Sequence, residues 1–156
     1  MKGNEKVLEL LNQLLTNELT SINQYFIHAK MCENWGFERL AGVLRAESID
    51  EMKHADDIIS RILFLQGVPN LQRLDKLHVG ETVKEQLESD LELERNAIGF
   101  LNTGIQTCRE CSDNATEDLF TRILVAEEKH TDWIETQLEL IRQVGEQNYL
   151  AQQIRK

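Results

Sequence analysis

The sequence predicts an all-α protein in which four long helices form a bundle. One proline, 6% aromatic residues and an abundance of Leu, Glu, Gln and Ala favour helices over strands. Apolar residues recur at helical spacing in four segments, which we expect to span residues 4–35, 38–66, 82–111 and 116–144. A chain of 156 residues suffices for one well-buried core and is short for two, so we expect a single domain over residues 1–156.

Boundary signals accompany these segments. Asn4 is the predicted N-cap of the first helix, and Gly36 separates the first helix from the second. Thr82 opens a predicted capping box at the start of the third helix, and Thr116 is the predicted N-cap of the fourth. A short fifth helix is expected over residues 147–154.

A long connection follows the second helix. Gly67, Pro69 and Asn70 end that helix and favour turns, and the chain as far as Gly80 has no helical periodicity. A segment of this length can run from one end of a bundle to the other. We therefore expect a long crossover between the second and third helices.

Acidic and imidazole side chains interrupt the apolar stripes of the four helices. They form two sets related by a shift of 76 residues: Glu18, Glu51 and His54, then Glu94, Glu127 and His130. In each set a Glu precedes a Glu-x-x-His pair by 33 residues, and both members of the pair lie on one helix face. This doubled spacing arises by chance in about one such chain in a thousand. It is the known ligand set of di-iron ferritin-like bundles, so the sequence predicts a di-iron site.

The alternative to a metal site is a bundle that buries hydrogen-bonded acids. Buried carboxylates without partners are costly, and no Lys or Arg lies on these stripes within a helical turn of the six residues. Two ferrous ions would offset the charge of four Glu side chains. Mixed oxygen and nitrogen ligands suit iron or manganese better than a thiolate-seeking metal.

Charge and cysteine content narrow the function classes further. The formal net charge of −10 disfavours nucleic acid and anionic membranes as partners. The chain opens with polar residues and has no apolar run of about 18 residues, so we expect no membrane attachment. Three cysteines, an odd number, suit a reducing compartment, and a cytoplasmic location is expected. Cys108 and Cys111 have Cys-x-x-Cys spacing without the second pair of a zinc set.

Several sequence blocks carry a resemblance to a known family. They are the opening MKG, INQYF at 22–26, ESIDEMKHAD at 47–56, RILFL at 61–65, PNLQ at 69–72 and DWIETQL at 132–138. With the ligand pattern, these blocks make the chain resemble the bacterioferritins over essentially its full length. The resemblance implies a ferritin-like bundle that assembles into a hollow shell of twenty-four subunits, acts as a ferroxidase on ferrous iron and stores ferric mineral.

The resemblance also implies roles for the site residues. The six ligands divide into two bridges, Glu51 and Glu127, and two terminal pairs, Glu18 with His54 and Glu94 with His130. Tyr25 and Trp35 are retained, which implies an aromatic electron donor beside the di-iron site. A core aromatic is the alternative for Tyr25.

Met52 is the candidate haem ligand. It lies with Ile49, Asp56, Ile59 and Leu63 on a face of the second helix that is distinct from the core stripe. The first helix offers a similar second face with Leu19, Ile22 and Phe26. The residues alone favour a subunit interface in which Met fills a gap. The resemblance implies instead haem b on a two-fold axis between subunits, with Met52 of each subunit as an axial ligand.

The partners that the resemblance implies are further copies of this chain, a second bacterioferritin subunit type that could co-assemble, and the bacterioferritin-associated 2Fe-2S ferredoxin in iron release.

Two residues depart from the family pattern. Arg45 and Ala46 stand where Tyr-His usually precedes the Glu-Ser-Ile-Asp block. The change removes an iron ligand expected on the cavity wall beside Asp50, and Arg45 would offer a cation to the haem propionates.

Two rival functions share parts of this pattern. A di-iron enzyme of the rubrerythrin type, which acts on peroxide, has the same ligand set, but rubrerythrins usually add a Cys-rich rubredoxin module that these residues do not contain. A purely structural, haem-carrying shell subunit would lack the di-iron ligands. All six ligands are present, which favours the catalytic kind of subunit.

Overall fold

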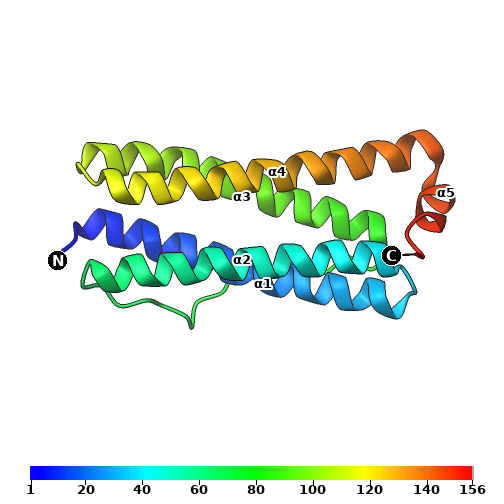
Figure 1. Ribbon diagram of the computed structural model, residues 1–156, viewed down its shortest axis with the longest axis horizontal. Coiled ribbons are helices and arrows are strands. Elements are labelled where there is room, and N and C mark those ends of the chain that lie inside the picture. Colours follow the sequence, from blue (N-terminus) through cyan, green and yellow to red (C-terminus); the bar gives the residue numbers. More distant parts are fainter. Residues whose placement is uncertain (156) are drawn as a thin grey trace.

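In the computed structural model, residues 1–155 are described, and they form five helices and no strand. The helices are α1 (Glu5–Asn34), α2 (Glu38–Phe64), α3 (Val83–Glu110), α4 (Asn114–Val144) and α5 (Glu146–Ala151), as Figure 1 shows. The predicted all-α bundle of four long helices with a short fifth helix is confirmed. α5 is shorter than the predicted 147–154 and begins directly after Gly145, whose φ of 87° breaks the helical path of α4.

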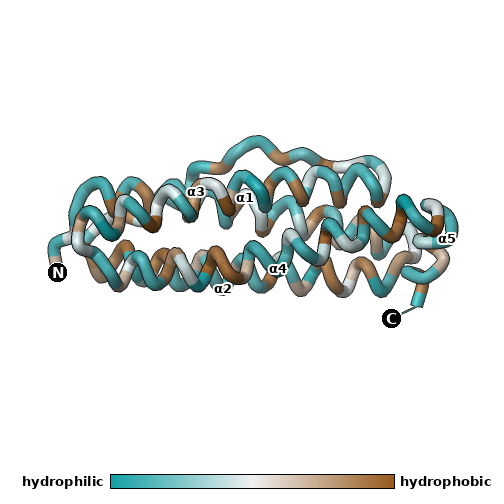
Figure 2. The backbone as a smooth tube through the Cα atoms, turned by 90° about the horizontal axis from the view of Figure 1, so that it is seen from above, coloured by the Kyte–Doolittle hydropathy of each residue, from teal (hydrophilic) through white to brown (hydrophobic). Residues whose placement is uncertain are grey.

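The four long helices form two antiparallel pairs. α1 packs mainly on α2, and α3 packs mainly on α4, so that the pairs stack as two layers (Figure 1). The predicted crossover runs the length of the bundle, and α2 and α3 are therefore parallel. It lies over the side formed by α1 and α3 (Figure 2). Within the described chain, no connecting segment covers the opposite side, formed by α2 and α4.

Side-chain hydrogen bonds fix the start of α1 and α3. Asn4 Oδ1 accepts from Lys6 N at 2.8 Å, and Thr82 Oγ1 accepts from Glu85 N at 3.1 Å. Both helices therefore have the expected N-cap. The Glu85 carboxylate accepts from Glu81 N at 2.8 Å instead of closing the capping box on the N–H of residue 82.

The prediction of Thr116 as the N-cap of α4 is wrong. The cap is Asp113, whose carboxylate accepts from the backbone N–H of Thr116 at 3.0 Å and from its hydroxyl at 2.7 Å. Arg61 of α2 donates to the same carboxylate at 2.9 Å. A charged acceptor with three donors outcompetes a hydroxyl as a cap, so α4 begins at Asn114.

Two apolar clusters fill the bundle, one at each end. The N-terminal cluster, where α1 begins, is made by Val7, Leu11, Leu14, Leu15, Ala55, Ile58, Ile62, Leu65, Leu101, Cys108, Leu119, Phe120 and Ile123. The α5-end cluster is made by Tyr25, Ala29, Cys32, Leu40, Ala41, Leu44, Val83, Leu87, Leu91, Ile134, Ile141 and Tyr149. The predicted metal ligands lie between the two clusters, near the middle of each long helix.

A buried polar network ties the crossover to the α5 end. Gly80 N donates to His28 Nε2 at 3.1 Å, which leaves the His28 proton on Nδ1, 3.0 Å from Asp90 Oδ1. Gln24 donates to the same Asp90 oxygen at 2.9 Å and accepts from His78 N at 3.1 Å. A Cβ at Gly80 would come within 2.3 Å of Gln86 N, so this close approach requires glycine.

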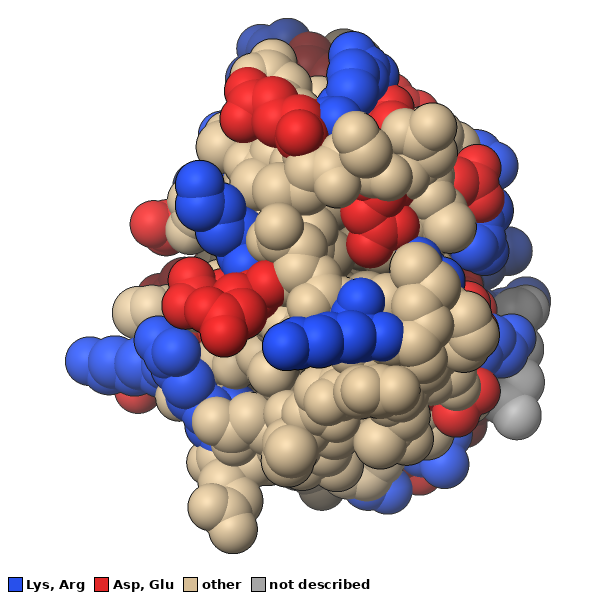
Figure 3. All heavy atoms as spheres, turned by 90° about the vertical axis from the view of Figure 1, so that its left-hand side faces the viewer, with Lys and Arg blue, Asp and Glu red and all other residues tan. Residues whose placement is uncertain are grey.

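The surface mixes both signs of charge. Figure 3 views the end where α1 begins, and Lys or Arg side chains are interspersed there with Asp or Glu side chains. The net charge of −10 is therefore not gathered into an acidic patch on this end. In the described residues, no helix combines the length and the apolar character that crossing a bilayer requires.

Candidate metal centre

The six side chains predicted as metal ligands converge in the middle of the bundle. Glu18 comes from α1, Glu51 and His54 from α2, Glu94 from α3, and Glu127 and His130 from α4. His54 is partly buried and the other five are buried. They form two groups, and within each group the ligand atoms all lie within 4.8 Å of one another. Glu51 and Glu127 belong to both groups, so the fold brings the six residues together as two adjoining sites.

Five of the six separations from the two histidines are longer than an N–H···O hydrogen bond and suit ligands of a shared ion. From His54 Nδ1 the distances are 3.6 Å to Glu18, 3.5 Å to Glu51 and 3.4 Å to Glu127. From His130 Nδ1 they are 3.1 Å to Glu51, 3.6 Å to Glu94 and 3.8 Å to Glu127. Oxygen and nitrogen ligands that each lie about 2.0–2.2 Å from one ion stand about 3–4 Å from each other.

Unpaired polar atoms concentrate at this place. Of nine buried side-chain nitrogen or oxygen atoms without a hydrogen-bond partner in the described chain, seven belong to the six residues. They are Glu18 Oε2, both carboxylate oxygens of Glu51, His54 Nδ1, Glu94 Oε2, Glu127 Oε1 and His130 Nδ1. Buried polar atoms normally have partners, so the alternative of hydrogen-bonded buried acids does not describe these atoms. Four carboxylates and two imidazoles fit two divalent ions.

Protons take the place of cations when no metal is bound. Burial, and then the charges of Glu51 and Glu94, raise the pKa of Glu127 well above its usual value. Burial would also raise the pKa of Glu51, but contacts with His130 and other neighbours outweigh it and lower this pKa to about 2. Burial would lower the pKa of His130, but carboxylates, Glu47 first, raise it to about 12. A metal ion bound among these side chains would compete with their protons.

Tyr25 lies directly beside the site. Its hydroxyl donates to Glu94 Oε1 at 2.7 Å, and its ring meets the His130 ring edge-on with centroids 6.5 Å apart. Burial and the neighbouring carboxylates raise the pKa of Tyr25 well above its usual value, so the phenol keeps its proton. Trp35 is not beside the site. It lies ten residues further along, about 15 Å of helix, at the exposed C-cap of α1, so only Tyr25 fits the expected aromatic neighbour.

Glu47 is a neighbour of the site to which the sequence assigned no role. It precedes Glu51 by one turn of α2, and its Oε2 contacts Nε2 of His130 on α4. Glu47, Asp50 and His130 also form a third group whose ligand atoms lie within 4.8 Å. The sequence signal was a third polar residue on the α2 stripe, beside Glu51 and His54, but its partner on α4 was not visible without the fold.

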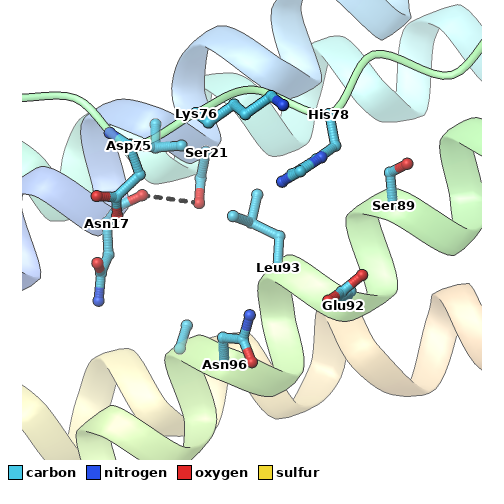
Figure 4. A pocket seen from close by; sticks show the side chains of 11 residues that line it. Asn17, Ser21, Asp75, Lys76, His78, Ser89, Glu92, Leu93 and Asn96 are labelled. Atoms are coloured by element: carbon cyan, nitrogen blue, oxygen red, sulfur yellow. Dashed lines mark hydrogen bonds between the residues drawn. The ribbon is translucent and has the colours of Figure 1, made fainter.

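Two hollows lie on opposite sides of the bundle. On the α2/α4 side, a hollow of about 280 Å³ is lined by His54 and His130 themselves, together with Asp50, Asp57 and Arg122 among others. On the α1/α3 side, under the crossover, a hollow of about 210 Å³ has Leu93 inside it and side chains of the crossover at its rim (Figure 4). None of the six ligands lines this second hollow. Of the two, the α2/α4 hollow is therefore the one that borders two of the six ligand residues.

The predicted haem-ligand face is mostly apolar and largely exposed in the single chain. Met52 is 56% exposed, Ile49 and Leu63 on the same face of α2 are exposed as well, and so is Phe26 of α1. Asp56 is the exposed acidic member of the face, and Ile59 is half-buried. The guanidinium of Arg45 lies 5.9 Å from the centre of the Phe26 ring, at the edge of this face. Such a face is typical of a surface that another subunit covers.

The bundle and its six-ligand site define the class of the protein. The family model of the ferritin-like domain matches residues 8–144, which span all four long helices. Among curated proteins, the chain is 51% identical to bacterioferritin BfrA of Mycobacterium tuberculosis over 152 residues, 97% of this chain and 96% of the relative. It is 53% identical to the bacterioferritin of Mycolicibacterium paratuberculosis with the same coverage. It is 45% identical to the bacterioferritin of Rhodobacter capsulatus, over 96% of this chain and 92% of the relative.

The chain therefore belongs to the bacterioferritin family, as its sequence blocks predict. This membership supports a role in iron storage.

Proposed function

We propose that this chain stores iron and oxidises ferrous ions at a di-iron site within the subunit. The observation that carries the proposal is the set of seven buried, unpartnered atoms on six ligand residues. Glu18 and His54 would hold one ion, Glu94 and His130 the other, with Glu51 and Glu127 bridging them. Four carboxylates with two ferrous ions and two neutral imidazoles carry no net charge, which favours burial.

Ferrous iron is the substrate, and a pair of ions passes two electrons to dioxygen or peroxide. The carboxylates favour this oxidation because anionic oxygen ligands stabilise the higher charge of the ferric product. The α2/α4 hollow, which His54 and His130 line, is the path by which ferrous iron reaches the ligands. Tyr25 is placed to supply a further electron, with its proton passing along the 2.7 Å bond to Glu94.

Neighbouring glutamates on α4 test the di-iron site. Glu127→Ala removes a proposed bridging ligand, whereas Glu128→Ala removes an exposed carboxylate at the next position. After aerobic addition of ferrous iron, stopped-flow absorbance should report a fast oxidation phase in the wild type and in Glu128→Ala. We expect Glu127→Ala to lose that phase while the subunits still assemble. A wild-type rate in Glu127→Ala would refute the site.

We further propose that the subunits form a shell of twenty-four copies with haem b between pairs of subunits. The support is the exposed apolar face around Met52, which offers a thioether for axial ligation. Met52→Leu keeps nearly the same volume and cannot ligate iron. It should abolish the haem Soret band without dissolving the shell, whereas a normal band would exclude Met52 as the ligand.

The proposal also includes two partners, a second subunit type and the bacterioferritin-associated ferredoxin. A pull-down with that ferredoxin tests the ferredoxin interaction.

Ala46 bears on the mineralisation phase. It is exposed on α2, one turn before Asp50, where an imidazole would add an iron ligand. We expect Ala46→His to speed mineralisation at several hundred irons per shell and to leave the fast first phase unchanged, because the six ligands are untouched. Equal mineralisation rates would show that this position is irrelevant here.

The rubrerythrin-type peroxide reductase is the second candidate, because the ligand set is shared. Native mass measured together with iron and haem per subunit separates the two functions. A large shell with a mineral of many irons supports storage, whereas a small oligomer that holds two irons per subunit and consumes peroxide supports the alternative.

A further inference from the structure

The two halves of the proposed di-iron site differ in how their ligands are held. In the Glu94/His130 half, Tyr25 donates to Glu94 Oε1 and leaves Oε2 free, and Glu47 contacts Nε2 of His130 and leaves Nδ1 free. Each of these two ligands thus has one atom held by a neighbour and a second, buried atom without a hydrogen-bond partner, Glu94 Oε2 and His130 Nδ1. A carboxylate on the far nitrogen of a ligand histidine fixes its ring orientation and raises its basicity.

The Glu18/His54 half has no such supports. In the part of the chain that the structure describes, Glu18 receives no side-chain hydrogen bond, and the carboxylates within 4.0 Å of His54 all face its Nδ1. His54 is also more exposed than His130, at 16% against 9% of the side chain.

The internal repeat explains this difference. Under the 76-residue shift that relates the two ligand sets, Leu101 is the equivalent of Tyr25 and Ile123 is the equivalent of Glu47. Both replacements are buried in the N-terminal cluster and have no polar atom to offer. Ile123 lines the same hollow as His54, where a carboxylate would be needed to hold that ring. The difference between the two halves of the site therefore results from two repeat-related pairs of residues, 25/101 and 47/123.

We propose that Glu47 is the positioning residue of His130 and that, together with Tyr25, it makes the Glu94/His130 half the first to take a metal ion. This inference rests on the proposed di-iron function. Preorganised ligands lose less conformational freedom when they bind, so the held half binds more tightly than the half whose ligands must first be ordered.

Cobalt(II) binding to the metal-free protein tests the order without any turnover. The ligand-field absorbance of Co²⁺ and calorimetry should show two binding steps in the wild type. His130→Ala should remove the tighter step and His54→Ala the weaker one. If the two variants affect the first step equally, the proposed order is overturned. If no Co²⁺ binds to the wild type in this core, the di-iron function fails as well, and the two failures are distinguishable.

Glu47 variants test the positioning role. We expect Glu47→Leu to weaken the first step about a hundredfold and Glu47→Gln, which keeps an oxygen for the ring N–H, about tenfold, with smaller changes in the second step. Ile123→Val, at the repeat-related position, is the matched control and should leave both steps unchanged. An unchanged first step in Glu47→Gln and Glu47→Leu overturns the inference, and Glu47→Gln alone decides if the Leu variant does not fold. A third equivalent of Co²⁺ that Glu47→Leu abolishes would make Glu47 a ligand and overturn it too.

Discussion

At the end of the bundle where α1 begins, the side chains between the helices are almost all apolar, whereas at the α5 end buried polar side chains lie among the apolar ones. The N-terminal cluster packs its helices through apolar side chains, and beside it Arg61 of α2 binds Thr116 and Asp113 at the start of α4. The α5 end adds Gln24, His28 and Asp90, which bind one another and the backbone of the crossover. The difference teaches that the long connection needs its own directional bonds, because a segment without helical periodicity has no apolar face to bury.

The largest loss of stability should follow from truncating a large side chain of the N-terminal cluster. Phe120 is fully buried and its ring lies 6.4 Å from the ring of Phe100. Phe120→Ala should lower the free energy of unfolding of the metal-free protein by about 3–5 kcal/mol, because the cavity adds to the lost burial. Chemical denaturation measures this loss. Val125→Ala, at an exposed position of α4, is the control and should change stability by less than about 0.5 kcal/mol. A loss below about 1 kcal/mol for Phe120→Ala would contradict the importance of packing at this end.

Breaking the polar network should cost less and act locally. Asp90→Ala leaves the buried donors of Gln24 and His28 without an acceptor, which costs about 1–3 kcal/mol. The amides of His78 and Gly80 should exchange with deuterium faster, since their acceptors lose orientation. Asp90→Asn keeps an oxygen acceptor and should show a smaller increase. Unchanged exchange at Gly80 in Asp90→Ala would mean that the network does not hold the crossover.

Two glycines of α3 offer a paired test of packing at the apolar end. A Cβ at Gly104 would lie 2.6 Å from Cε2 of Phe120, whereas a Cβ at Gly99 meets nothing within 4 Å. Gly104→Ala should therefore destabilise by about 1–3 kcal/mol through overpacking. Gly99→Ala should stabilise by up to about 1 kcal/mol, because alanine favours the helix. Thermal unfolding of both variants decides the matter, and a common sign would refute the comparison.

The smallest effect concerns the cap of α4, which also lies at the apolar end. Asp113→Ala removes the acceptor for Thr116 and Arg61 and should cost about 1 kcal/mol. Burial would raise the pKa of Asp113, but hydrogen bonds from Thr116 and the charge of Arg61 outweigh it and lower this pKa. The stabilisation by the charged cap is therefore present above the unfolded pKa of about 3.9. The difference between wild type and variant should shrink as the pH falls below about 4. A difference that grows in acid would contradict the charged cap.

The sequence predicted the helices and the six converging side chains because both depend on spacing along the chain. A Glu and a His three residues apart share a helix face wherever the helix lies, and the 33-residue offset repeats in both halves. The contact of Glu47 with His130 joins residues of two different helices and has no repeat-related copy, so spacing could not reveal it. The cap of α4 was missed for a similar reason, since Asp113 gains its advantage from Arg61 of another helix.

The polar network at the α5 end could not be predicted from the sequence, for another reason. Gln24 and His28 stand four residues apart on the buried face of α1, a spacing that periodicity treats as an interruption of the apolar stripe. Their shared acceptor is Asp90, and their backbone partners are His78 for Gln24 and Gly80 for His28, all more than 50 residues away along the chain. Only the fold brings these five residues together.

The side on which the crossover lies decides which flank of the subunit stays open. His28, Gln24 and Thr20 all project from α1, and by binding Gly80, His78 and Asp75 they draw the connection over α1 and α3. A connection of the opposite hand, made of the same residues, would have run over α2 and α4. It would have covered the α2/α4 hollow that His54 and His130 line. The path of this one loop thus leaves the hollow lined by His54 and His130 uncovered in the single chain, whereas the loop itself crosses the other flank.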